Sequence, residues 1–365
     1  MKKDPRVRYA VDHYATRFVA NGGDYYDFQR VTNRVDHWDD WCQTWSECGA
    51  MHEQLGDSAE AAQHFESAAC HYVHAALAYH FGKFLFACYP RELRAAHDRT
   101  VSAYQRALPF LDFPGERVAI PYEGGARLYG ILRTPHRRYD WCPVVILVPG
   151  LDSVKEELHQ AGNDLLQRDM AVLAIDGPGQ GEMEFEYPMR HDYEAVIRHA
   201  IDYLETRPEL DAGRVGLLGI GLGGYYALRS TAYEPRVKAT IAVAPVYDLV
   251  GDFDRLPRLI RDAFIARSGS TSVFQALAKL ESFHLAGVMN KVRCPLLIIV
   301  GRTGDPAPAE DAAYLTEEAG EAAALWLFEE GNPTCDNIVY RQRPQRADWM
   351  HDQLYRLPPS QPWLP

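Results

Sequence analysis

The sequence has no long apolar run, since no stretch offers the ~18 consecutive apolar residues that a membrane span needs. An excess of basic residues is also missing, because 50 Asp and Glu outweigh 38 Lys and Arg and leave a formal net charge of −12. Nucleic acid is normally bound by a basic face, so we expect neither a nucleic-acid nor a membrane partner. The N-terminus leads into polar sequence and not into the apolar core of a signal peptide, which predicts a cytoplasmic protein.

Cysteine is scarce, with seven residues and no Cys-x-x-Cys pair. An odd number of dispersed cysteines predicts reduced, mostly structural thiols. The histidines are dispersed as well, and no histidine and carboxylate group has clean metal-ligand spacing in the sequence. The glycine-rich stretch 177–181 lacks the Gly-Lys-Ser/Thr ending of a phosphate loop. We therefore expect neither a metal nor another cofactor.

The residues that are present fall into two differently patterned parts. Residues 1–112 predict a helical N-terminal domain, because strong helix formers recur there at helical spacing, as over 59–69. Residues 113–365 predict an α/β domain, since apolar strand segments alternate with helical segments. That alternation is typical of a mostly parallel sheet flanked by helices. The stretch 250–285 interrupts it and predicts a helical insertion over the site.

Turns and strands can be placed within this outline. Glycine-rich clusters at 22–24 and 56–58 predict turns or helix entries. A hairpin is predicted around residues 123–125. Its two strands and the later strands are expected at 117–122, 126–132, 143–148, 171–175, 215–218, 239–243, 296–300 and 325–328.

One segment has the context of a nucleophile elbow without the nucleophile. Residues 219–224, Gly-Ile-Gly-Leu-Gly-Gly, lie between a predicted buried strand and a predicted helix start. This strand, turn and helix order is that of the Gly-x-Ser-x-Gly elbow of α/β-hydrolases, with Gly221 in place of the serine. Glycine has no side chain to activate, so no acyl-enzyme can form at this position. Glycine nevertheless suits the strained backbone of an elbow.

The motifs at 148–157, 176–182 and 347–349 together resemble the 2,6-dihydroxypseudooxynicotine hydrolase family of α/β-hydrolases. With the helical N-terminal third, the resemblance covers almost the whole chain. It implies an α/β-hydrolase fold with a helical domain packed over the active edge of the sheet. The family includes carbon–carbon bond hydrolases, and related proteins shorten or release polyketides. The resemblance also makes a homodimer through the helical domain plausible.

The resemblance implies a dismantled catalytic triad. The family's serine falls on Gly221, and its histidine falls on Pro333 within the string 331–337. The triad acid falls on Gly304 when it is counted without a gap, with Asp305 one residue later. Two alternatives stay open for this acid, which is either kept at Asp305 or lost. An engineered serine knockout would leave the histidine in place, so the combined losses favour natural divergence.

Several groups could still do chemistry. The backbone amides of Leu222 and Leu151 correspond to the two donors of an oxyanion hole. Asp152, Glu156 and Glu157 follow a strand that ends at the expected pocket, so one of them could act as an acid or base. The alternative is that these three carboxylates only stabilise a helix N-terminus. Asp305 is likewise either the residual acid or a turn former.

The substrate cavity is expected to have walls from both domains. From the helical domain we expect His80 and Lys83, although an ordinary interhelical core with Lys83 reaching towards water is the alternative. From the α/β domain we expect Met183, Tyr225 and Tyr247. A small-molecule substrate is the expected partner.

Three functions are compatible with these residues. The first is a non-hydrolytic enzyme that guides a cyclisation, elimination, isomerisation or carbon–carbon bond rearrangement of a polyketide-like or aromatic natural-product intermediate. Such reactions depend on positioning and charge stabilisation more than on a nucleophile. The second is a catalytically inactive binding or scaffolding protein. The third is a carbon–carbon bond hydrolase in which Glu156, Glu157 or Asp305 activates water directly.

Overall fold

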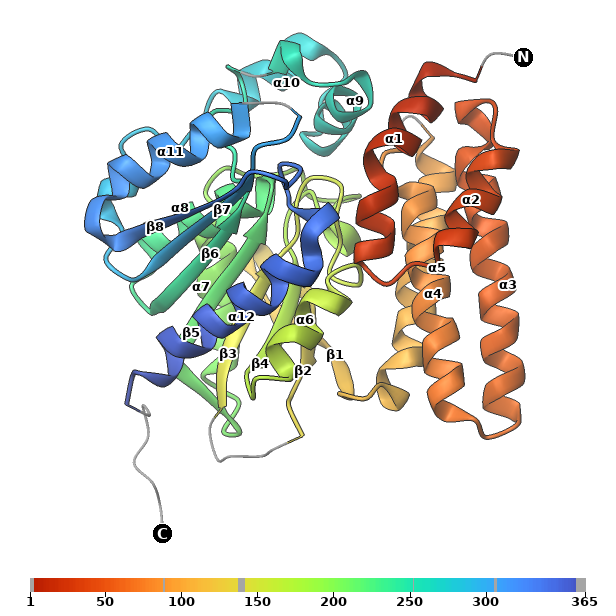
Figure 1. Cartoon of the computed structure of the whole chain (residues 1–365), viewed down its shortest axis with the longest axis horizontal. Coiled ribbons are helices and arrows are strands. Elements are labelled where there is room, and N and C mark those ends of the chain that lie inside the picture. The colour runs from red at the N-terminus through yellow and green to blue at the C-terminus, as the bar shows by residue number, and fades with distance from the viewer. Residues whose placement is uncertain (1–2, 88, 137–141, 252, 305–306, 359–365) are drawn as a thin grey trace.

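The computed structural model describes residues 3–87, 89–136, 142–251, 253–304 and 307–358 of the chain. Five α-helices precede the first strand within these residues, and the remaining helices alternate with an eight-stranded sheet (Figure 1). The helices are α1 (Pro5–Ala20), α2 (Tyr25–Arg34), α3 (Trp41–Ala61), α4 (Phe65–Lys83), α5 (Pro90–Ala107), α6 (His159–Leu166), α7 (Glu194–Leu204), α8 (Leu222–Tyr233), α9 (Arg258–Arg267), α10 (Val273–Leu280), α11 (Ala307–Ala319) and α12 (Val339–Tyr355). The strands are β1 (Gly115–Pro121), β2 (Arg127–Arg133), β3 (Cys142–Val148), β4 (Ala171–Asp176), β5 (Leu210–Ile220), β6 (Val237–Val243), β7 (Leu296–Gly301) and β8 (Ala323–Phe328).

The sheet runs in the order β1-β2-β4-β3-β5-β6-β7-β8. β1 and β2 form the predicted hairpin, and β2 also pairs with β4 in the antiparallel sense. All the other neighbouring strands are parallel. The predicted α/β-hydrolase fold with a mostly parallel sheet and a helical N-terminal region is therefore confirmed.

Helices cover both faces of this sheet. α6 and α12 contact each other on one face, and α7 and α8 contact each other on the other face (Figure 1). Successive side chains of β3 point to opposite faces of the sheet. Val144 and Ile146 pack in the core with α7 and α8. Val145 and Leu147 pack in the core with α6 and α12. A strand buried on both faces has to be apolar throughout, which is why β3 is a continuous apolar run.

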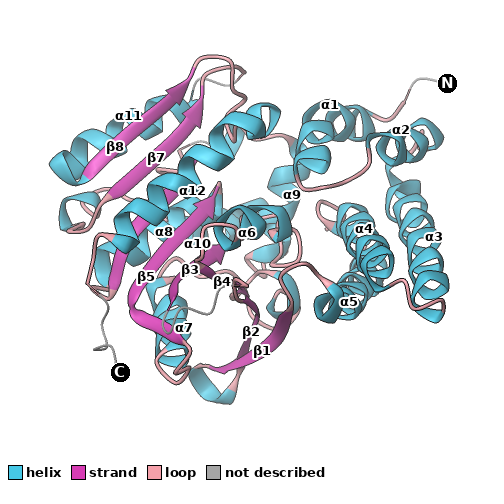
Figure 2. Ribbon diagram, turned by 60° about the horizontal axis from the view of Figure 1, so that its bottom comes forward, coloured by secondary structure: helices cyan, strands magenta, loops and turns pink. Residues whose placement is uncertain are grey.

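The N-terminal helices α1–α5 form a bundle beside the sheet (Figure 2). Its core is rich in aromatic side chains, and Trp41, Trp45 and Phe81 are fully buried there.

β1 begins shortly after α5, while the domain division at residues 112 and 113 stays a prediction. α9 and α10 lie between β6 and β7, where the helical insertion was expected. Within the described ranges, no helix combines the length and apolar character that crossing a bilayer requires.

The structure corrects two local predictions in the bundle. The helix expected over 59–69 is interrupted, because α3 ends at Ala61 and α4 begins at Phe65, with Gln63 in a left-handed conformation at φ 61°. The turn expected at 56–58 lies inside α3 instead. The close approach of α3 and α4 leaves no room for a side chain at position 56. A Cβ on Gly56 would lie 2.4 Å from the Tyr72 ring. The turn at 22–24 is confirmed, with Asp24 capping α2.

Replacing Gly56 with alanine should lower the free energy of unfolding by about 1–3 kcal/mol, because the added methyl group overpacks the α3–α4 contact. The intrinsic preference of alanine for helices, roughly 1 kcal/mol, acts in the opposite direction and is outweighed. Urea denaturation of G56A measures the difference, and Ser58→Ala, at an exposed position of the same helix, is the control. A G56A protein as stable as the original would contradict the close packing.

Candidate functional site

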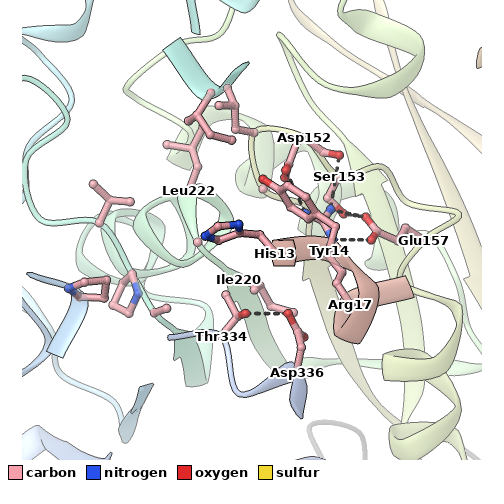
Figure 3. A pocket seen from close by; sticks show the side chains of 18 of the residues that line it. His13, Tyr14, Arg17, Asp152, Ser153, Glu157, Ile220, Leu222, Thr334 and Asp336 are labelled. Carbon is pink, nitrogen blue, oxygen red and sulfur yellow. Dashed lines mark hydrogen bonds and ion pairs between the residues drawn. The ribbon is translucent and has the colours of Figure 1, made fainter. Parts of the chain in front are cut away.

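A cavity of about 370 Å³ opens at the carboxyl ends of the central strands (Figure 3). Ligands of open α/β sheets bind at this edge. One wall is polar and comes from α1, the loop after β3 and the segment after β8; it includes His13, Tyr14, Arg17, Asn21, Asp152, Ser153, Glu157, Thr334, Asp336 and Arg343. The opposite wall comes largely from the segment between β6 and β7 and is mostly apolar, with Arg255 as a charged member; its apolar residues include Leu249, Leu256, Pro257, Ile260 and Phe264.

Gly221 occupies the sharp turn between β5 and α8. Its φ of 60° and ψ of −122° give the strained elbow backbone that glycine tolerates best. The turn is fixed by a hydrogen bond of 2.9 Å from the Gly221 amide to the Val243 carbonyl oxygen. A Cβ on Gly221 would have no heavy atom within 4 Å, so the position faces open space. The elbow is therefore built with room for a ligand atom where a nucleophile would stand.

Two backbone amides lie beside this space. Leu151 and Leu222 both line the cavity, and a Cβ built on Gly150 would lie 4.0 Å from the Leu222 nitrogen. The Gln180 side chain donates a 2.5 Å hydrogen bond to the Pro149 carbonyl oxygen and so ties the loop after β3 to the turn after β4. Neither the Leu151 nor the Leu222 amide donates to another group in the part of the chain that the structure describes. Both N–H groups are thus available to an oxygen atom of a ligand.

Asp336 is a carboxyl group of the cavity that was not predicted from the sequence. It begins the short helical turn Asp336–Ile338 and accepts a 2.6 Å hydrogen bond from the Thr334 hydroxyl. Burial raises the pKa of Asp336, and this outweighs the opposing effects of Thr334, Arg17 and Arg343. A carboxyl group whose pKa is raised can both accept and return a proton more readily near neutral pH. The only signal in the sequence was its place in the 331–337 string, three residues after Pro333.

His13 is the second missed group, and Figure 3 shows its ring in the middle of the cavity. Its Nδ1 lies 2.9 Å from the Tyr9 carbonyl oxygen, and the imidazole stacks on the Tyr9 ring with centroids 4.1 Å apart. A carbonyl oxygen accepts only an N–H, so Nδ1 carries the proton and Nε2 is unprotonated in the neutral ring. No sequence signal linked this exposed position of α1 with an elbow some 200 residues later.

Glu157 lines the cavity, as predicted, but its oxygens are engaged. They accept hydrogen bonds from Arg17 at 2.7 Å, Asn21 at 2.8 Å and Ser153 at 2.6 Å, and His80 Nε2 lies 3.0 Å away. Burial opposes ionisation, yet Arg17 and His80 outweigh it and hold the pKa of Glu157 well below its usual value. A carboxylate in this state is a poor proton acceptor.

Asp152 also lines the cavity, and Arg17 donates to it over 2.9 Å. Glu156 does not lie on the cavity wall. It pairs with Lys155 at 2.7 Å, and Lys155 also pairs with Asp176 at 2.8 Å. The carboxylates at 156 and 157 therefore belong to buried ion-pair clusters, and not simply to a helix N-terminus.

The predicted groups His80 and Lys83 lie behind the cavity wall. His80 contacts Glu157, and Lys83 pairs with Glu184 at 3.1 Å. The side chain of Lys83 is completely buried, so the alternative in which it reaches towards water is wrong. Glu184 also pairs with Arg267 of α9, so two buried cations share this carboxylate. These residues tie α4 to the α/β part.

The other predicted wall residues lie elsewhere. Met183 is buried in a short helical turn, and the Tyr225 hydroxyl donates to the His191 carbonyl oxygen at 3.2 Å. Tyr247 packs edge-on against Tyr314. None of these three is among the residues that line the described cavity, although Val246 beside Tyr247 is. Met183 and Tyr225 are directed into the surrounding core, whereas Tyr247 is half-buried beside the exposed Tyr314.

The positions of the expected histidine and acid are close together. A Cβ on Gly304 would lie 4.0 Å from Cδ of Pro333, which supports placing the two triad positions there. Neither residue has a side chain that can transfer a proton. Asp305 lies outside the described residues.

A family model described as esterase FrsA-like matches residues 28–355. The 2,6-dihydropseudooxynicotine hydrolase of Paenarthrobacter nicotinovorans is 30% identical over 341 residues, covering 93% of this chain and 91% of that protein. A crystal structure of the 2,6-dihydroxy-pseudo-oxynicotine hydrolase has a TM-score of 0.86 at 29% identity and covers 94% of this chain and 98% of that one. The α/β hydrolase pydG of Acremonium sp is 32% identical over 63% of this chain and 57% of its own length.

Proposed function

Since the chain belongs to the esterase FrsA-like family, we propose that it is an α/β-hydrolase-fold enzyme that rearranges a polyketide-like or aromatic natural-product intermediate without hydrolysing it. The observation that carries this proposal is the open space at Gly221, next to two available amides and in the same cavity as the Asp336 carboxyl group. The relatives named as hydrolases support a small-molecule substrate.

The proposed chemistry begins with a substrate carbonyl group above Gly221. The Leu151 and Leu222 amides donate hydrogen bonds to its oxygen and stabilise the enolate by about 3 kcal/mol. The Asp336 carboxylate removes a proton from the neighbouring carbon, the C–H electron pair becomes the carbon–carbon double bond of the enolate, and the C=O π pair moves onto the carbonyl oxygen. The enolate then forms a carbon–carbon bond, expels a leaving group or takes the proton back at another carbon. His13 is a second group able to transfer a proton, and the apolar wall positions the carbon skeleton.

The central step can be tested before the natural substrate is known. Aryl alkyl ketones are incubated with the protein in D₂O, their binding is followed by ligand-observed NMR, and deuterium at the carbon beside the carbonyl is measured by mass spectrometry. Ketones that bind should exchange at least about 100-fold faster than in buffer, the lower range of general acid–base catalysis. Ketones that bind without faster exchange would contradict the proposal and favour an inactive binding protein.

The role of the elbow space is tested by a pair of variants. Gly221→Leu fills the space and should slow the exchange at least about tenfold, because the carbonyl group can no longer reach the two amides. Gly221→Ala has the same unfavourable backbone conformation, worth roughly 1–3 kcal/mol of stability, but adds only a methyl group to the open space. G221A should therefore keep most of the activity, and equal losses in both variants would assign the effect to backbone strain.

Direct attack of water is the competing chemistry. When the product of a natural intermediate is formed in ¹⁸O-labelled water, hydrolysis places one labelled oxygen in the product, whereas a rearrangement places none. Label in the product would overturn the non-hydrolytic proposal and favour a hydrolase in which a cavity carboxylate activates water.

A further inference from the structure

The helical bundle assembles a second group of chemically active side chains, far from the elbow in sequence. Asp27 of α2 meets Cys48 and His52 of α3, and one ligand atom from each of these residues lies within 4.8 Å of the other two. α2, α3 and α4 run side by side here (Figure 1). Cys48 and His52 are four residues apart and so share one face of their helix.

Two histidines of α4 complete the surroundings. The ring of His74 stands edge-on to His52 with centroids 5.2 Å apart, and the ring of His71 lies 5.9 Å from His52. Imidazole nitrogens are common ligands of divalent metal ions.

The bonding of His52 is incomplete. Its side chain is 8% exposed, and its Nε2 lies 2.5 Å from an Asp27 oxygen. Its Nδ1 is buried and has no hydrogen-bond partner among the described residues, and Nδ1 of His71 is in the same state. Buried polar atoms normally have partners. Nε2 of His52 faces Asp27, so Nδ1 is the ring nitrogen left without a partner in the described part of the chain.

We propose that Asp27, Cys48 and His52 form a site for a zinc-type divalent metal ion, with His74 as the nearest further ligand. Thiolate, imidazole and carboxylate together suit Zn²⁺ or Co²⁺, whereas Mg²⁺ and Ca²⁺ prefer oxygen ligands alone. Ligand atoms around tetrahedral zinc are roughly 3.5 Å apart, so the three groups need to move by only about an ångström. The proposal does not rest on the function proposed for the cavity beside Gly221, called the elbow cavity below.

Arg30 competes for the same ligands. Its guanidinium pairs with Asp27 at 2.5 Å and lies 3.7 Å from the Cys48 sulfur. The Arg30 side chain is 49% exposed, whereas that of Asp27 is 13% exposed, so Arg30 can turn into solvent while the ligands stay in place. A thiol binds a metal ion as the thiolate, so the ion has to displace the Cys48 proton on binding.

The test uses the full-length protein, stripped with a chelator and then titrated with Co²⁺ and Zn²⁺. Co²⁺ should produce a thiolate-to-metal absorption band, and Zn²⁺ should abolish it at one equivalent. Cys48→Ser should remove the band, and His52→Gln should weaken binding at least about tenfold. Cys70→Ser and His64→Gln, exposed positions outside the cluster, are the matched controls. Circular dichroism verifies that each variant is folded.

Arg30→Ala gives a test in the opposite direction. It removes the competing cation without touching a ligand and should tighten Co²⁺ binding several-fold. Absence of the thiolate band in the unmodified protein, or an unchanged band in folded C48S, would overturn the site. Both outcomes leave the ketone exchange at the elbow cavity unaffected, so the two proposals fail independently.

Discussion

Replacing Asp336 with asparagine should slow proton exchange at the ketone α-carbon by about 10²–10⁴-fold, the usual contribution of a general acid–base group. Asparagine keeps the size of the side chain and an oxygen that can accept from Thr334, but it cannot take up a proton. The fold should survive, because the substitution removes a buried carboxyl group whose ionisation is already disfavoured. The measurement is the kcat of α-deuterium exchange.

The pH profile distinguishes proton transfer from a packing effect. Because burial raises the pKa of Asp336 above the ordinary value of 3.8, the acid limb of kcat/KM should lie above that pH in the unmodified enzyme. D336N should lack this limb. Asp98→Asn changes an exposed carboxylate of the helical bundle and should leave both the rate and the profile unchanged. A full rate in D336N would exclude Asp336 as the base and direct attention to His13.

Among the substitutions proposed above and below, Glu157→Ala should lower the free energy of unfolding most, by about 3–5 kcal/mol. It removes a buried carboxylate and leaves the buried donors around it without their partner. Arg17 and His80 both depend on this carboxylate, and they come from two different helices of the bundle. Urea denaturation measures the loss. Glu47→Ala removes a solvent-exposed pair with Arg34 and should cost less than about 1 kcal/mol. Similar losses in the two variants would contradict a central role for Glu157.

The stability effect of Glu157 should also depend on pH. Its pKa is lowered in the folded protein, so its contribution is complete above its usual pKa of 4.5 and is lost as the pH falls through the folded value. Burial lowers the pKa of its partner His80 below 6.5, and the unfolded chain therefore gains a proton first as the pH falls. Both groups make acid destabilising. The difference in unfolding free energy between the unmodified protein and E157A should narrow below pH 4.5.

Local pattern was enough to predict the sheet. The apolar run of β3, the hairpin of β1 and β2 and the glycine-rich elbow each depend on residues adjacent in sequence. The prediction failed where a distant contact decided the local structure. Gly56 looked like a turn residue because glycine favours turns, but its missing side chain serves the approach of Tyr72 from the next helix.

The site residues show the same difference between what local motifs predict and what distant contacts decide. Gly221, Leu151 and Leu222 were found because they belong to a local motif, and all three line the cavity. His80 and Lys83 were expected at the cavity wall and lie behind it, because the carboxylates of Glu157 and Glu184 bind their charged or polar ends. A sequence shows which residues are able to form ion pairs. Which partner each of them meets depends on the tertiary structure.

The sequence by itself determined the hydrolase scaffold and the absence of a side chain at Gly221, because strand pattern, turn chemistry and residue type are local properties. Only the tertiary structure decided what surrounds that glycine. It brought His13 from the first helix and Asp336 from the last loop into one cavity, and it placed Asp27 against Cys48 and His52 in the bundle. The physical reason is that proton transfer and metal binding depend on distances of a few ångströms, and residues far apart in the chain reach those distances only when the helices and strands pack.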